Sequence, residues 1–401
     1  MRIGIEAFKI FRKNKHGMDI VALEQIKRIP YLDRENLYFI FCFQDSDDFA
    51  LEDIENVKII KLPRIPSPIA EQFVLPFLAI KYQLDILHST GNTSPLFLHC
   101  KRIITLHDII YLRKDLLLKG GSTYQRIGNA YRRLIVPFVL PKATTIFTVS
   151  ETEKVEITKS LPQLKNRISV IYNACSSNFT LKPEQSTLAS KLKYHLPNEP
   201  YYLVHGNTDP KKNTRNTLIA FHHLLKEGKL KRKIVLTDLK LSEVNKIIKK
   251  HELVGLLDHI HLTNYVNHEN MPDLYTRAFA FLYPSIRESF GLPILEAMSC
   301  GTPVITSNCS CMPEIANQAA LLVDPFEPSS IARGIDKMES NDKLRMDLIE
   351  KGKKRSKDFS WTHSTKKLIE LYKSTFQPTL RIISKARESE EKEIDQQLKA
   401  S

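Results

Sequence analysis

A strand, a turn, a helix and a second strand are predicted in succession between Ala278 and Ser307. The apolar run AFAFLY ends at Pro284, and the apolar run TPVITS closes the stretch. Between them, GLPILEAMSC carries a proline in a first helical turn, where its N–H has no partner to lose, and Gly301 follows as the expected C-cap. A helix N-terminus at the carboxyl edge of a parallel sheet presents free amides and the positive end of a dipole. The pattern therefore predicts a phosphate-binding turn beside Gly291.

Short β-rich runs alternate with helical or loop segments along the chain. They are RIGIEAF (2–8), LYFIFCF (37–43), VKIIKL (57–62), LDILHST (84–90), RIITLHD (102–108), TIFTVS (145–150), YYLVH (201–205), KIVLTD (233–238) and HIHLTNYV (259–266). This alternation predicts an α/β protein of doubly wound, Rossmann-like domains. The polar, proline-bearing stretch over residues 180–200 is typical of a linker between two such domains. We expect an N-terminal domain over residues 1–179, a linker over 180–200, a C-terminal domain over 201–375 and a charged tail over 376–401.

The charge of the chain favours a polyanionic partner. Its 59 Lys and Arg residues outnumber 45 Asp and Glu residues, which gives a formal net charge of +14. Nucleic acid, phosphorylated substrates and anionic lipid headgroups all suit such an excess. The basic residues are spread along the whole chain instead of gathering with aromatic platforms, so we expect no nucleic-acid partner, and a nucleic-acid-binding α/β protein is the alternative hypothesis.

No apolar run approaches the roughly 18 residues that cross a bilayer, and MRIGIEAFKIF lacks a separate signal core, so we expect a cytoplasmic protein. Residues 122–143 form a basic amphipathic segment that suits peripheral contact with the inner face of an anionic membrane. An ordinary surface helix packed on the sheet explains the same pattern and is the favoured interpretation. The six cysteines are scattered through apolar segments, which favours buried free thiols over metal or disulfides.

Two carboxylates flank the predicted phosphate turn, Glu288 in the loop and Glu296 in the helix. A carboxylate in the second position can accept hydrogen bonds from vicinal hydroxyls, as acids do with ribose, whereas a solvated side chain is the alternative for each. The surrounding ESFGLPILEAMSCGTPVI resembles the nucleotide-sugar site of GT-B glycosyltransferases, above all glycosyltransferase family 4, mannosyltransferase-like branch. That family has two such Glu residues separated by seven positions. The resemblance implies that Glu288 contacts the donor sugar and Glu296 the nucleoside ribose.

Further segments carry the same resemblance. GNTDPKKN (206–213) is similar to a family segment whose glycine lets the chain approach the donor and whose lysine neutralises the diphosphate. The resemblance gives these roles to Gly206 and Lys212, with Lys211 beside them. TLHD (105–108) resembles a segment whose histidine, His107 here, lies near the donor sugar; apart from the family, a histidine beside an aspartate is more often a structural hydrogen-bonded pair. Ser150 and Glu153 fit a capping box of the following helix.

The resemblance implies two Rossmann-like domains that face each other across a cleft, the first on the acceptor side and the second binding the nucleotide sugar. It further implies a retaining transfer of a hexose to a glycan or lipid-linked glycan, without a metal or a cofactor. Mannose is the first expected hexose. GDP-mannose is the first expected donor and a UDP-sugar the second. A sugar-nucleotide epimerase or a phosphorylase of the same architecture is a further alternative. The expected catalytic residues are Glu288, His107 and Lys212; the donor contacts are Gly206, Lys211, Lys212, Arg287, Ser289, Phe290, Gly291, Leu292 and Glu296; the acceptor-side residues are Gly17 and Asp108.

Overall fold

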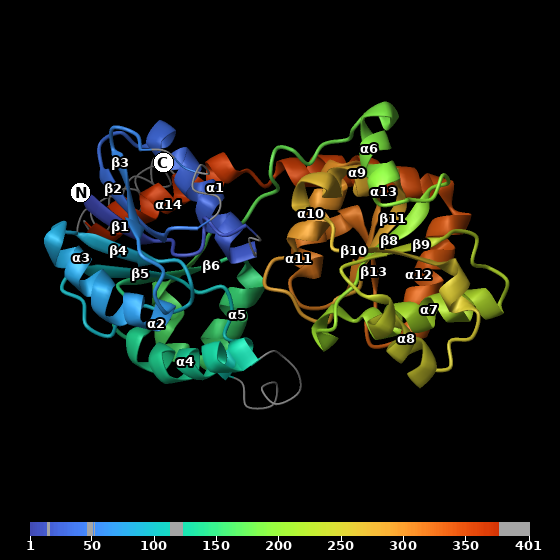
Figure 1. Ribbon diagram of the computed structural model, residues 1–401, viewed down its shortest axis with the longest axis horizontal. Helices are drawn as coiled ribbons and strands as arrows, with labels where there is room; N and C mark the ends of the chain where they lie inside the picture. The colour runs from blue at the N-terminus through green and yellow to red at the C-terminus, as the bar shows by residue number, and fades with distance from the viewer. Residues whose placement is uncertain (14–16, 46–50, 52, 113–122, 377–401) are drawn as a thin grey trace, which may run out of the picture.

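The computed structural model describes residues 1–13, 17–45, 51, 53–112 and 123–376. Within these ranges the chain forms two parallel β-sheets, each covered by helices, which lie side by side along the long axis of the molecule (Figure 1). The predicted α/β, doubly wound architecture is confirmed. The carboxyl edge of each parallel sheet is the edge at which such folds place their ligands.

The first sheet has seven strands in the order β3-β2-β1-β4-β5-β6-β7. The strands are β1 (Arg2–Glu6), β2 (Leu37–Phe43), β3 (Val57–Leu62), β4 (Ile86–Ser89), β5 (Lys101–Thr105), β6 (Thr145–Thr148) and β7 (Ile168–Val170). The order changes direction between β1 and β4. Ligand-binding crevices of open parallel sheets form at such a switch point.

The second sheet has six strands in the order β10-β9-β8-β11-β12-β13. The strands are β8 (Tyr201–His205), β9 (Ile234–Thr237), β10 (Ile260–Asn264), β11 (Ala278–Tyr283), β12 (Val304–Ser307) and β13 (Ala320–Val323). Its switch point lies between β8 and β11, the strands that end in His205 and Tyr283. The two sequence segments with the strongest resemblance, GNTDPKKN and ESFGLP, follow these two strands.

Helices pack on both sheets. The first carries α1 (Gly17–Leu32), α2 (Ser67–Ile69), the π-helical turn η1 (Ala70–Val74), α3 (Leu75–Lys81), α4 (Thr123–Val139) and α5 (Glu151–Ser160). The second carries α6 (Leu188–Lys193), α7 (Thr214–Lys226), α8 (Leu241–Lys250), α9 (Met271–Arg277), α10 (Leu292–Ser299), α11 (Met312–Ala316), α12 (Pro328–Ser340) and α13 (Asp342–Lys357). The last helix, α14 (Trp361–Phe376), returns to the first sheet.

Both faces of the second sheet are buried, which explains its nearly continuous apolar strands. In β11, Phe281 and Tyr283 point into the core shared with α9, α10 and α11, whereas Ala280 and Leu282 point into the core shared with α7 and α12. Alternate side chains of a strand face opposite sides, so a strand covered on both sides is apolar at every position. The AFAFLY run is therefore a buried strand, as the sequence predicted.

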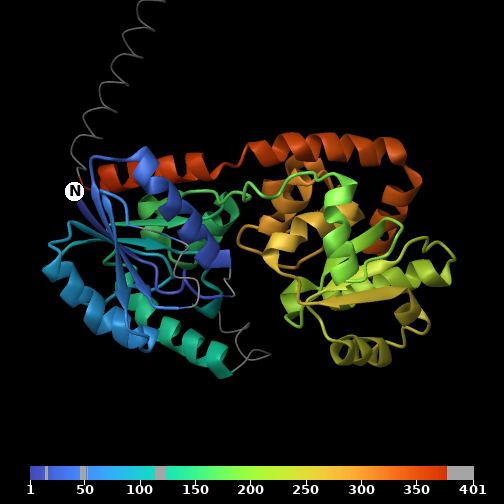
Figure 2. The same cartoon turned by 45° about the horizontal axis from the view of Figure 1, so that its top comes forward.

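Helix α14 ties the end of the described chain to the first sheet, as Figure 2 shows. Leu368 and Tyr372 are buried in the core of that sheet, and the Tyr372 hydroxyl lies 2.7 Å from His88 Nδ1. The division predicted from the sequence ends the second domain at residue 375, and the family resemblance also implies a last helix that crosses back to the first domain, as α14 does. The stretch predicted as a linker is instead bonded to the second domain, since Ser190 in α6 donates a hydrogen bond to Asp273.

None of the helices in the described ranges combines the length and the apolar character that crossing a membrane requires. All six cysteines are free thiols, three of them buried and three half-buried, and they are Cys42, Cys300, Cys311, Cys100, Cys175 and Cys309. The predicted free thiols are confirmed, although half of them retain some exposure.

Candidate functional site

Two loops leave the second sheet side by side, one after β8 and one after β11. Asn213 joins them from a left-handed backbone conformation with φ of 61°, and its Nδ2 donates to the Pro284 carbonyl at 3.0 Å. The Ile286 amide donates to the Lys211 carbonyl at 2.7 Å. These bonds hold the lysine-bearing loop against the glutamate-bearing loop.

Lys212 and Glu288 form an ion pair across the two loops. Lys212 Nζ lies 2.8 Å from Glu288 Oε1 and 2.9 Å from the Tyr283 hydroxyl. The lysine side chain is 24% exposed and the glutamate side chain 12% exposed, so water screens this pair only in part. The amide of Glu288 also donates to Ser310 Oγ, which fixes the loop that carries the carboxylate. The structure thus brings together two of the three predicted catalytic residues.

Glu296 lies in α10 and is buried at the other end of the same edge. Its Oε2 accepts a hydrogen bond from the Tyr275 hydroxyl at 3.3 Å, and its Oε1 lies 3.2 Å from His268 Nε2. Burial lowers the pKa of His268, but the hydrogen bond and charge of Glu296 outweigh burial and raise it above its usual value. Glu296 therefore lies beside an imidazole that takes up a proton more readily than an ordinary histidine.

A half-buried histidine, His205, connects the two carboxylates. Its Nε2 lies 3.1 Å from the Tyr275 hydroxyl, and its ring centroid lies 6.3 Å from that of Tyr283. Burial, reinforced by the charges of Lys212 and His268, lowers the pKa of His205 to about 3, so the ring is neutral. A continuous row of side chains thus runs along the edge of the sheet. We call it the site row; its members are Glu288, Lys212, Tyr283, His205, Tyr275, Glu296 and His268.

Helix α10 begins directly after the loop that carries Glu288. Gly291 caps the helix with φ of 87°, a conformation that favours glycine, and no side chain caps the helix by a hydrogen bond. Pro293 is in the first turn and Gly301 follows the helix at φ of 75°, as the sequence predicted. Pro293 has no N–H, and the Ile294 amide donates to the Gly291 carbonyl at 3.0 Å. The first turn therefore offers an anion the amides of Gly291 and Leu292 and the positive end of the helix dipole.

Three predicted donor contacts are engaged elsewhere. Phe290 is buried and packs edge-on against Phe359, so its ring belongs to the core. Arg287 pairs with Glu153 of the first domain at 3.2 Å. Lys211 pairs with Asp209 at 3.6 Å on the outside of the loop. Of the three cations predicted near the diphosphate, the structure places Lys212 in the site row, and Lys211 and Arg287 have the partners given above.

The residues predicted in the first domain lie at its own carboxyl edge. His107 is buried; its amide donates to Asn92 Oδ1 at 2.7 Å, and its Nε2 lies 3.0 Å from the Thr90 carbonyl, which implies a proton on Nε2. Burial lowers the pKa of His107. Asp108 is half-buried and accepts the Ile110 amide at 3.2 Å, whereas Gly17 is the exposed first residue of α1. His107 is thus held as a neutral, oriented imidazole.

The two domains meet at the N-terminus of α5. Ser150 Oγ accepts the Glu153 amide at 3.1 Å, which confirms the predicted cap, and donates to the Ser289 carbonyl of the second domain at 2.7 Å. Glu153 lies on the same turn, and its side chain pairs with Arg287 instead of closing the capping box. Burial, opposed by Arg287, raises the pKa of Glu153 to about 7.

Glu314 extends this contact from α11. Its carboxylate accepts the Glu151 amide at 2.7 Å, the Thr152 amide at 2.8 Å and the Tyr172 hydroxyl at 2.9 Å, all from the first domain. A carboxylate on a helix N-terminus is favoured by the helix dipole. The first turn of α5 is therefore bound to the second domain through Ser289, Arg287 and Glu314.

Two families match the sequence. The family described as glycosyl transferases group 1 matches residues 190–355, and the family described as glycosyltransferase family 4 matches residues 30–178. The chain is a family 4, group 1 glycosyltransferase. The two matches fall one on each sheet, and the segment in residues 190–355 contains the whole site row.

Relatives of the glycosyltransferase include O-antigen chain mannosyltransferase B of Escherichia coli, 34% identical over 234 residues, which are 58% of this chain and 61% of that protein. The serotype-specific mannosyltransferase WbdA of Escherichia coli is 25% identical over 67% of this chain and 33% of that protein. The chain thus spans about three fifths of the first and a third of the second. Anabaena HepE, solved in complex with UDP, superposes with a TM-score of 0.68 at 17% identity, covering 93% of this chain and 99% of that one. The fold is GT-B.

The interdomain contact of the glycosyltransferase predicts a stability effect at Glu314. We expect Glu314→Ala to lower the free energy of unfolding by about 1–2 kcal/mol, because α5 loses the carboxylate at its first amides. Thermal unfolding measures this effect, with Glu199→Ala, an exposed glutamate outside the helices, as the control. Equal midpoints for the two variants would show that the Glu314 contacts contribute nothing.

Gly206 has a packing role at the end of β8. A Cβ at this position would lie 2.8 Å from the Leu239 side chain and closer still to the Thr237 carbonyl oxygen. We expect Gly206→Ala to destabilise the glycosyltransferase by about 1–3 kcal/mol, because the backbone must shift. Gly17→Ala is the matched control, since a Cβ there meets nothing within 4 Å. Urea unfolding compares the two, and equal stability would contradict the packing role.

Proposed function

We propose that this chain transfers a mannosyl group from GDP-mannose to a glycan or lipid-linked glycan. A hexosyl group from a UDP-sugar is our second candidate for the transferred group. The observation that carries the proposal is the Lys212–Glu288 ion pair beside the uncapped first turn of α10, with Glu296 at the far end of the same row. The names of the relatives, an O-antigen chain mannosyltransferase and WbdA, favour mannose. The UDP complex of HepE keeps a uridine nucleotide as the second choice.

The donor would lie along the site row. Lys212 and the first amides of α10 suit a diphosphate, because both present positive charge. Glu288 is the acid that pairs with Lys212 in the absence of a donor. Glu296 suits a ribose, since a carboxylate can accept bonds from two vicinal hydroxyls, and the neighbouring His268 compensates its charge. Glu288 would then accept hydroxyls of the hexose.

The transfer breaks the bond between the anomeric carbon and the diphosphate oxygen and forms a bond from that carbon to the acceptor oxygen. The acceptor proton passes to the departing phosphate, as in a front-face route with retention of configuration. Negative charge grows on the leaving group, and Lys212 with the α10 amides stabilises it without a metal in this proposal. Glu288, already paired with a lysine, orients the sugar instead of attacking it. From the first domain, His107 would present a neutral, oriented imidazole near the donor sugar.

A ligand panel followed by product analysis tests the proposal. GDP, UDP, GDP-mannose and UDP-glucose are compared by thermal shift, since a ligand that binds only the folded state raises its melting temperature. We expect the largest shift for the guanine nucleotides, with or without EDTA. Incubation of GDP-mannose with a mannose-terminated oligosaccharide should then release GDP and extend the glycan by one α-linked residue. Release of free epimerised nucleotide sugar instead of a glycan would assign an epimerase.

A further inference from the structure

Glu296, the buried carboxylate at the far end of the site row, lies against an imidazole. Its Oε1 is 3.2 Å from His268 Nε2, and its Oε2 accepts the Tyr275 hydroxyl at 3.3 Å. The side chain of Glu296 is 10% exposed and that of His268 is 43% exposed. Among the residues that the structure describes, no lysine or arginine forms an ion pair with Glu296. A buried carboxylate is costly to leave unpaired, so the imidazole is the group that balances its charge.

The imidazole of His268 is held in place from two sides. Its ring meets the Phe179 ring edge-on, with 4.9 Å between the two centroids, and Phe179 is itself buried. The 3₁₀ turn that begins at His268 ends at Asn270, whose Nδ2 donates to the Tyr194 hydroxyl at 2.9 Å. The ring therefore faces Glu296 from a fixed turn, which is what a residue that orients another side chain requires.

The charged groups around His268 favour its protonated form. Burial lowers the pKa of His268, but three neighbouring carboxylates together raise it by more; they are Glu296 in α10, Glu24 in α1 of the first domain and the adjacent Glu269. The neighbouring base, His205 in β8, is neutral, because burial lowers its pKa to about 3. His268 therefore keeps its proton to a higher pH than an ordinary histidine and loses it as the pH rises further.

The carboxylate of Glu296 keeps acceptor capacity while it is paired. A carboxylate offers about four lone-pair sites on its two oxygens, and here each oxygen has one neighbour at hydrogen-bond distance, His268 or Tyr275. One site on each oxygen remains for the 2′- and 3′-hydroxyls of a ribose, which are adjacent on the sugar ring. The bonds from His268 and Tyr275 fix the plane of the carboxylate, and that plane decides whether both hydroxyls reach it.

We propose that His268 is a positioning residue for the ribose of the donor: its protonated imidazole donates to Glu296 and holds that carboxylate in the orientation that accepts both ribose hydroxyls. The neutral ring gives a weaker bond, because a charge-assisted hydrogen bond is about twice as strong as a neutral one. Selectivity for a ribose over a dideoxyribose is then greatest at low pH and decreases as the pH rises through the pKa of His268. The inference rests on the proposed function, which places a ribose on Glu296.

A ratio of two dissociation constants tests this role, that of 2′,3′-dideoxy-GDP divided by that of GDP. Both ligands carry the same diphosphate, so the titration of the phosphates cancels and the contribution of the ribose hydroxyls remains. Calorimetric titration of the full chain supplies both constants between about pH 5.5 and pH 8.5. We expect the wild-type ratio to fall by about three- to fivefold across this range, since the imidazole is partly exposed and water screens its charge. UDP and its dideoxy form replace the guanine pair if the ligand panel ranks UDP first.

Two substitutions of His268 separate its charge from its shape. His268→Gln keeps a neutral donor and should show the low ratio at every pH. His268→Lys keeps a positive donor and should retain the high ratio to about pH 8.5, because lysine stays protonated there. A purely structural role predicts neither the pH dependence nor its removal by lysine.

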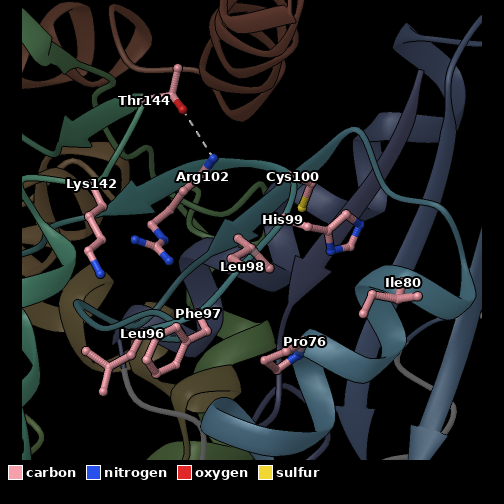
Figure 3. Close-up of a pocket in the computed structure, with 10 residues that line it drawn as sticks. All are labelled: Pro76, Ile80, Leu96, Phe97, Leu98, His99, Cys100, Arg102, Lys142 and Thr144. Atoms are coloured by element: carbon pink, nitrogen blue, oxygen red, sulfur yellow. Dashed lines mark hydrogen bonds between the residues drawn. The ribbon is translucent and has the colours of Figure 1, made fainter.

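Two control variants should reproduce the wild-type profile. His363→Gln removes an exposed imidazole from α14. Lys142→Gln removes a permanent positive charge and so controls for long-range attraction of the diphosphate. Lys142 lines a hollow of about 520 Å³ in the first domain, at the edge of the sheet where β5 and β6 begin, as Figure 3 shows. The site row lies instead where β8 and β11 end.

Glu296→Ala distinguishes failure of this inference from failure of the proposed function. We expect this variant to lose the preference for GDP over the dideoxy nucleotide at every pH. If it does so while His268→Gln matches the wild type throughout, the ribose lies on Glu296 and His268 does not position it, which overturns the inference alone. A wild-type ratio that stays constant with pH would also overturn the inference alone. A preference that survives in Glu296→Ala would overturn both, because the ribose would then lie elsewhere.

Discussion

Glu288→Ala is expected to lower kcat by about 100- to 1000-fold while GDP affinity changes by less than about threefold. The reason is positional: Glu288 lies at the sugar end of the site row, whereas Lys212, the α10 amides and Glu296 suit the nucleotide. Turnover is measured as GDP release from GDP-mannose, and affinity by calorimetric titration of GDP. The same two measurements on Glu327→Ala, an exposed glutamate, should match the wild type.

Glu288→Gln separates charge from shape in this first prediction. Glutamine keeps the size of the side chain and one acceptor oxygen, but it cannot neutralise Lys212. We expect a smaller loss of kcat than for alanine, because part of the hydrogen bonding to sugar hydroxyls survives. Equal losses of turnover and GDP affinity in the alanine variant would count against a role on the hexose and would place Glu288 at the diphosphate instead.

Lys212→Met should weaken GDP binding by about 10- to 100-fold and leave guanosine binding nearly unchanged, since a charge-assisted hydrogen bond to phosphate contributes roughly 1.5–3 kcal/mol. Methionine keeps the length of the side chain and removes its charge. Lys211→Met is the adjacent control, because that lysine pairs with Asp209 on the outside of the loop. We expect the Lys211 variant to bind GDP within about threefold of the wild type.

Two outcomes would reject this role for Lys212. One is an equal loss of guanosine and GDP binding, which would indicate a general disturbance of the site. The other is an equal effect of the Lys211 and Lys212 variants, which would indicate only a long-range charge. Thermal unfolding of both variants is part of the test, because Lys212→Met leaves Glu288 unpaired at a position that is 12% exposed.

Local sequence signals predicted the elements around the site. The apolar run of β11 and the proline and glycine around α10 determine structure through neighbours in the chain, and each lies where expected. The η1 turn at Ala70–Val74 was not predicted. A π-helical turn widens a helix by one residue and depends on tertiary packing, which sequence periodicity does not report.

The sequence predicted those members of the site row that lie in a shared motif and missed those that do not. Glu288, Glu296 and Lys212 came from two short segments. His205, Tyr275 and His268 come from β8, α9 and the loop after β10, and long-range packing alone brings them together. A histidine at the end of a strand beside the switch point was the available signal for His205.

Arg287 shows why a motif does not predict which partner a side chain takes. The sequence places it beside Glu288, but its guanidinium turns to Glu153, which is 134 positions away in the other domain. The same holds for Phe290, whose ring packs on Phe359. Partners so far along the chain are visible only in the folded molecule, so adjacency to a functional residue predicts a shared loop and not a shared role.

A crystal structure of the protein with GDP tests the central claim most directly. The account predicts a diphosphate oxygen within about 3 Å of Lys212 Nζ and of the first amides of α10, with both ribose hydroxyls on the Glu296 carboxylate. A nucleotide bound away from the edge where β8 and β11 end, or a ribose that makes no contact with Glu296, would contradict it.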